Sequence, residues 1–161
     1  MNKKIKIATQ LWLAVFLILA TFSLSHADDY LTTLPERIQE HSMWCWDASS
    51  QAILNYYDNY PTQCAIANWA WTRTDCCNEP DNFEWWSSTN RHPCNQPNCL
   101  YGANQCISGI LSHYRGISSV GRAYALSEST VLSESNARRP FVIRYGWYPN
   151  PYDTGHAMVG H

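Results

Sequence analysis

The segment Gln39–Ser49 reads QEHSMWCWDAS and places one cysteine, Cys45, between two tryptophans. From Cys45 to about Asp58, apolar residues recur at mixed three- and four-residue spacing, which predicts a helix. Ser42 is suited to cap this helix, and the acidic Asp47 suits the positive end of its dipole. The segment therefore predicts a cysteine in the first turn of a helix.

Three further helices and a β-hairpin are expected downstream. Gly116 stands where a glycine ends the third helix, and Ser127 is suited to cap the fourth. The expected ranges are 64–73, 105–114 and 127–138 for the helices, and 141–145 and 155–159 for the strands. Because helices come first and strands later, the fold class is expected to be α+β.

The first 27 residues have the layout of a secretory signal peptide. Lys3, Lys4 and Lys6 precede the apolar run Leu11–Ala20, and small residues mark a cleavage site before Asp28. The apolar run is short for a transmembrane helix. We therefore expect residues 1–27 to be a signal peptide and residues 28–161 to form one exported domain, periplasmic or secreted, with no membrane attachment after cleavage.

Charge excludes one class of partner. Beyond the expected signal peptide, the chain of 161 residues has eight arginines, no lysine and 13 acidic residues, a formal net charge of −5. A nucleic-acid-binding domain normally carries a basic surface. Nucleic acid is therefore not an expected partner.

The seven cysteines divide into one upstream residue, Cys45, and six that lie between positions 64 and 106. In an oxidising compartment an even set is expected to pair, which leaves one free thiol. The six disulfide candidates are Cys64, Cys76, Cys77, Cys94, Cys99 and Cys106. Fifteen pairings are possible for six cysteines. A zinc site made by Cys76, Cys77, Cys94 and Cys99 is the less favoured alternative, because two of these cysteines are adjacent.

Cys45 is a candidate nucleophile, because the unpaired N–H groups at a helix N-terminus favour a thiolate. The alternative is a structural role, in which Cys45 is buried and packs like a small apolar residue. Gln39 lies on the preceding loop and could supply an amide donor for an oxyanion. Candidate bases are the histidines His41, His92, His113, His156 and His161. Of these, His156 opens the last expected strand, where a backbone ladder would hold an imidazole rigidly.

The segment Gln39–Ser49 resembles the nucleophile region of papain-like cysteine peptidases. It is most similar to an exported bacterial branch, related to bacteriocin-leader peptidases, whose motif is Gln, five residues, then Cys-Trp-Ala-Ala-Ser. Further likenesses follow in the expected order and cover almost the whole mature chain: Asn55-Tyr56-Tyr57, Gln63-Cys64, Asp75-Cys76-Cys77, Arg139-Pro140-Phe141 and Gly155-His156.

This resemblance implies a papain-like fold and thiol-dependent hydrolysis of a peptide or protein substrate without a cofactor. Cys45 would be the nucleophile, His156 the general base and then acid, and Gln39 the oxyanion donor. The chain departs from the family in two ways. Asp47 replaces an alanine, and the chain ends five residues after His156, before the Asn or Asp that orients the family's histidine.

This early end indicates that the chain is truncated relative to the family, with an incomplete sheet. Two alternatives therefore stand beside the peptidase. One is a catalytically inactive binding or toxin-like module with the same fold. The other is an amidase or acyl transferase that uses the same cysteine, because acyl transfer does not fix the acceptor.

Overall fold

A computed structural model describes residues 34–78, 93–146 and 155–160. The expected signal peptide, His92, His161 and the connection between the two expected strands lie outside these residues. None of the helices in the described ranges is long and apolar enough to span a membrane. In chain order the elements are α2 (Cys45–Tyr56), α3 (Gln63–Trp71), the short 3-10 helix η1 (Cys76–Asn78), α4 (Ile107–Arg115), α5 (Glu128–Asn136), β1 (Phe141–Gly146) and β2 (Gly155–Gly160).

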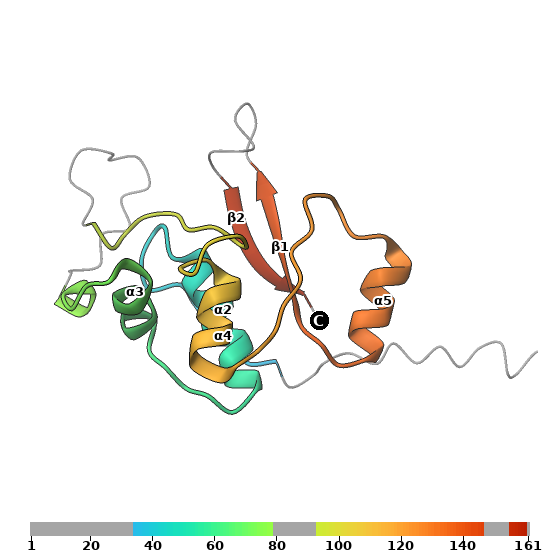
Figure 1. Ribbon diagram of the computed structural model, residues 1–161, viewed down its shortest axis with the longest axis horizontal. Coiled ribbons are helices and arrows are strands. Elements are labelled where there is room, and N and C mark those ends of the chain that lie inside the picture. Colours follow the sequence, from blue (N-terminus) through green and yellow to red (C-terminus); the bar gives the residue numbers. More distant parts are fainter. Residues whose placement is uncertain (1–33, 79–92, 147–154, 161) are drawn as a thin grey trace, which may run out of the picture.

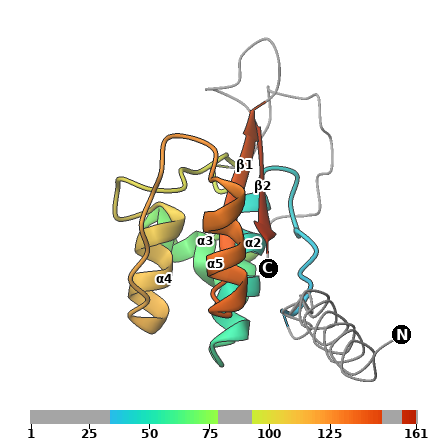
Figure 2. The same ribbon diagram turned by 90° about the vertical axis from the view of Figure 1, so that its right-hand side faces the viewer.

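The fold is α+β, as the order of the predicted elements indicated. Helix α2 contacts α3, α4 and β2. The β1–β2 hairpin lies between this helical part and α5 (Figure 1). In the turned view, α5 lies in front of α2, and α4 stands to the left (Figure 2). All four expected helices and both strands are present, with ends that differ from the predicted ones by at most two residues.

The core forms where α2, α3 and α4 meet. It contains both tryptophans next to Cys45, Trp44 and Trp46, each only 1% exposed. Leu54 of α2 and Ile110 of α4 are fully buried in the same cluster, and β2 contributes Ala157. Burying two tryptophans immediately beside Cys45 ties the start of α2 to the centre of the domain.

The predicted caps of α4 and α5 are confirmed, whereas the predicted cap of α2 is wrong. Ser127 Oγ accepts the N–H of Thr130 at the start of α5, and Gly116 ends α4 with φ of 65°. Ser42, by contrast, does not cap α2. The N-cap position is Trp44, which makes no side-chain capping bond. Ser42 Oγ instead accepts a hydrogen bond from Asn95 Nδ2 at 3.0 Å, so its hydroxyl serves a long-range contact.

The two strands pair antiparallel, from Phe141 opposite Gly160 to Gly146 opposite Gly155. This register places His156 directly opposite Tyr145. Gly155 is required beside it, because a Cβ at this position would overlap the carbonyl oxygen of Tyr145. The hairpin therefore fixes the backbone that carries His156.

Candidate functional site

All seven cysteines lie in the described part of the chain, and six of them form disulfides. The pairs are Cys64–Cys77, Cys76–Cys94 and Cys99–Cys106. Cys45 is the free cysteine. The zinc alternative is therefore wrong, because its four proposed thiolates are distributed over the three disulfides. Asp75 lies close to Cys76 and Cys94, but these two sulfur atoms are bonded to each other.

This pairing predicts a simple result for the folded, non-reduced protein. Its mass should be lower by about six hydrogens than that of the fully reduced chain, because each disulfide removes two. Under denaturing conditions without reductant, one thiol should react, and peptide mapping should assign it to Cys45. Two or more reactive thiols would contradict the three pairs.

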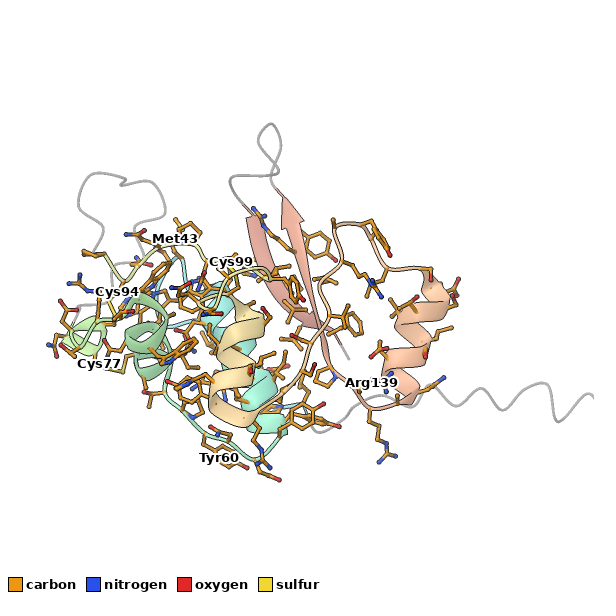
Figure 3. All side chains as sticks on the ribbon, viewed as in Figure 1. Met43, Tyr60, Cys77, Cys94, Cys99 and Arg139 are labelled. Carbon is orange, nitrogen blue, oxygen red and sulfur yellow. A yellow bond between two sulfur atoms is a disulfide. The ribbon has the colours of Figure 1, made fainter. Side chains whose placement is uncertain are left out.

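The turn before Cys45 is held by the segment 94–96. Asn95 Oδ1 accepts the N–H of Met43 at 2.9 Å, and the indole N–H of Trp44 donates to the Cys94 carbonyl at 2.8 Å. The indole N–H of Trp46 donates to the Gln96 carbonyl at 2.9 Å. Met43 and Cys94 lie at the same end of the helical part (Figure 3). Because Cys94 is bonded to Cys76 of η1, a disulfide anchors the segment that holds the turn.

Cys45 is the first residue of α2 and is partly exposed. The N–H of Trp44 donates to the His41 carbonyl, and the N–H groups of Asp47 and Ala48 donate to the Trp44 carbonyl. Among the described residues, none of these turn and cap bonds uses the N–H of Cys45 or of Trp46. Unpaired N–H groups in the first turn are normal for a helix and stabilise an anion next to them. The geometry at Cys45 is therefore that of a thiol beside free backbone donors.

Gln39 lies over the turn that leads into α2. Its Nε2 donates to the carbonyl oxygens of both His41 and Ser42, each at 3.1 Å. The side chain therefore folds back toward the helix start, as an oxyanion donor would. Both amide hydrogens are engaged with the loop, so stabilising an oxyanion requires the release of one of them.

The element that carries His156 packs against the helix that carries Cys45. Strand β2 contacts α2, and the two run in the same direction, downward in Figure 1. Cys45 is the first residue of α2 and His156 the second of β2, so both lie at the same end of the packed pair. The described residues show no hydrogen bond between the Cys45 thiol and the His156 imidazole.

Strand geometry explains this lack of contact. Ala157 of β2 belongs to the core, and neighbouring side chains on a strand point to opposite faces. His156 therefore lies on the face opposite Ala157, together with Met158, which is 45% exposed. The structure thus brings the two backbones to one end of the fold but leaves the two side chains unpaired.

The other described histidines have structural surroundings. His41 is buried, and its ring meets the Trp44 ring edge-on with centroids 4.2 Å apart. His113 stacks on Trp69, with centroids 4.4 Å apart and an interplanar angle of 15°. His41 packs against the core, and His113 lies on α4. No hydrogen bond joins Cys45 to any of the three described histidines, so His156 stays the candidate base on the ground of the resemblance alone.

Asp47 is the most unusual group near Cys45. It is fully buried, and neither carboxylate oxygen has a hydrogen-bond partner among the described residues. Burial raises the pKa of Asp47 well above its usual value, and the negative charge of Glu40 raises it further. Its N-terminal position was predicted from the sequence, but its burial was not. A raised pKa favours the neutral carboxyl, which weakens any repulsion of a thiolate at Cys45.

Two amides that organise the turn escaped the sequence analysis. Asn95 bonds to both Ser42 and Met43, as described above. Gln63 Oε1 accepts the Glu40 N–H at 2.9 Å, and its Nε2 donates to the Ile38 carbonyl at 2.7 Å. Gln63 was noted only as part of the family resemblance, and Asn95 lies in a stretch without periodicity. A single sequence carries no signal that these amides reach back to the turn.

Comparisons of the chain with protein-family models, with curated proteins and with solved structures gave no match.

Proposed function

We propose that this protein is an exported, thiol-dependent peptide hydrolase with Cys45 as its nucleophile. The observation that carries the proposal is the isolation of Cys45. Every other cysteine is in a disulfide, while Cys45 keeps a free, partly exposed thiol at the first residue of a 12-residue helix. Three disulfides also indicate an oxidising compartment, which supports export.

In the proposed reaction, the Cys45 thiolate attacks a peptide carbonyl carbon. The developing oxyanion is bound by the N–H of Cys45 and, once it turns away from the loop carbonyls, by the amide of Gln39. His156 takes the thiol proton and gives it to the leaving amine, after which water hydrolyses the acyl-enzyme. The hydrogen bonds from the indole N–H groups of Trp44 and Trp46 to the carbonyls of residues 94 and 96 keep Cys45 in place.

Forming the dyad requires His156 to move toward Cys45. Hydrogen bonds of catalytic groups are often long or absent without substrate and form in the complex. The two groups lie at the same end of the α2–β2 pair, but His156 lies on the face of β2 opposite the core residue Ala157, so the approach requires the start of β2 to rotate as well as the imidazole. The proposal therefore predicts that a covalent inhibitor on Cys45 brings the imidazole into contact with it.

The test of the nucleophile is alkylation of the folded protein. We expect iodoacetamide at about pH 6 to label Cys45 faster in the folded protein than in denaturant, because a helix N-terminus favours an anion beside its unpaired N–H groups. Peptide mass mapping gives the site, and the same reaction in denaturant gives the reference rate. Labelling that is slower in the folded protein than in the denatured one would contradict an activated nucleophile.

A second candidate function is a catalytically inactive binding module with the same fold. Two observations favour it: Cys45 and His156 are not hydrogen-bonded, and Gln39 is engaged with its own loop. An inactive module would keep its ligand after Cys45 is alkylated. A peptidase would lose its turnover.

A further inference from the structure

A groove lies between α3 and α4, where the loop before α4 packs against the first turn of that helix. Its volume is about 460 Å³, within the range of small-molecule sites. Three aromatic rings line it, those of Trp69, Tyr101 and His113. Polar side chains complete the lining: Asn104, Ser108 and Ser112. None of these residues takes part in the peptidase proposal.

The loop that forms one wall of the groove is rigidly held. The Cys99–Cys106 disulfide closes it, and the carbonyls of Cys99 and Leu100 accept the N–H groups of Ile107 and Ser108 at the start of α4. The loop lies directly on α4 only because Gly109 has no side chain. A Cβ at this position would overlap the carbonyl oxygen of Asn104. The lining is therefore set before any ligand arrives.

The aromatic rings are also fixed in place. Trp69 is stacked on His113 and meets Tyr114 edge-on. Tyr101 lies against the backbone of Gly121, where a Cβ would overlap the tyrosine ring. Its side chain is nevertheless 57% exposed. An exposed ring that is held by backbone offers a flat apolar face at little entropic cost.

The Asn104, Ser108 and Ser112 side chains of the lining are not engaged in hydrogen bonds in the described part of the chain. Among the described residues, no hydrogen bond uses the Asn104 amide or the hydroxyl groups of Ser108 and Ser112. The described lining contains no Asp, Glu, Lys or Arg. It contains no strand edge that could pair with an extended peptide. What remains is an aromatic face flanked by amide and hydroxyl groups.

We propose that this groove binds a neutral saccharide. The C–H face of a sugar ring would stack on the aromatic lining, because the negative face of an aromatic ring attracts weakly positive hydrogens. The sugar hydroxyl groups, which are both donors and acceptors, match the amide of Asn104 and the two serine hydroxyls. The site is independent of Cys45, so the two proposals fail or succeed separately.

The test is binding to a microarray of neutral and anionic glycans, followed by titration calorimetry with the best neutral ligand. We expect Tyr101→Ala to weaken binding about tenfold, the equivalent of one lost stacking contact. Asn104→Ala should also weaken it. Tyr124→Ala is the matched control, because Tyr124 is 69% exposed and lies outside the groove. The non-reduced mass verifies that each variant keeps its three disulfides.

Three outcomes would overturn the proposal. One is the absence of binding to any neutral glycan on the array. Another is a glycan affinity that is equal in Tyr101→Ala and in the parent protein. The third is a preference for anionic glycans or for a peptide in the same titration, since the lining argues against both.

Discussion

Replacing Cys45 by serine is expected to lower kcat/KM for peptide hydrolysis by about 1000-fold or more, and His156→Ala by a similar factor. Serine keeps the size of the side chain but lacks the acidity of a thiol, and alanine removes the imidazole at the start of β2. Turnover is measured by mass spectrometry on a peptide library with the parent protein and each variant. Because the two groups act as a unit, the double variant should be no worse than either single one.

The matched control for His156 is Met158→Ala. Met158 lies on the same face of β2, two residues further along, and is 45% exposed. This variant tests whether any loss comes from disturbing the hairpin and not from losing the imidazole, and we expect it to keep turnover. Hydrolysis by Cys45→Ser at the parent rate would exclude the nucleophile. Hydrolysis by His156→Ala at the parent rate would exclude the dyad.

The local pattern of the sequence was enough to predict the elements of the fold. The apolar spacing after Cys45 predicted α2, and Ser127 marked the start of α5 because a side-chain oxygen there satisfies an unpaired N–H. The odd number of cysteines and the upstream position of Cys45 predicted the free thiol. These predictions succeed because caps, periodicity and cysteine counts are properties of nearby residues.

Long-range contacts set the parts that the sequence did not reveal. The specific disulfide pairs depend on how η1 and the 93–106 segment fold against α3 and α4. Ser42 was expected to cap α2, but its hydroxyl instead accepts a hydrogen bond from Asn95, more than 50 residues away in the sequence. The face on which His156 lies depends on strand alternation relative to Ala157, which joins the core. The motif identified the candidate residues, but it did not determine whether their side chains meet.

The burial of Asp47 predicts that the protein becomes less stable as the pH rises. Below the ordinary Asp pKa of about 3.9, the carboxyl is protonated in both the folded and the unfolded chain. Above it, the unfolded chain loses this proton, while the folded chain keeps it because burial and Glu40 raise the pKa of Asp47. The free energy of unfolding should therefore fall with increasing pH until the raised pKa is passed.

Asp47→Asn removes this ionisation while keeping the shape of the side chain. We expect the variant to unfold with a free energy about 3 kcal/mol higher than the parent at pH 8, because asparagine, unlike aspartate, gains no solvated charge in the unfolded chain as the pH rises. At pH 4 the two should be nearly equal. Urea unfolding across this pH range, with disulfides intact, measures the difference. The charged group that acts on Asp47 is Glu40, from the loop before α2. Asp47 in turn acts on Tyr114 of α4, whose pKa is raised by burial and by the charge of Asp47.

Asp58→Asn is the matched control, because Asp58 is exposed just beyond the other end of α2. Its effect on the free energy of unfolding should stay small and should not grow with pH. An Asp47→Asn variant that is less stable than the parent at pH 8 would show that the carboxylate has a favourable partner in the folded protein. A gain in stability that grows with pH would instead show that Asp47, two residues from the proposed nucleophile, lowers the free energy of unfolding of the parent protein. Alkylating Cys45 in this variant then separates the two roles, because the labelling rate should change little if the buried carboxyl is already neutral.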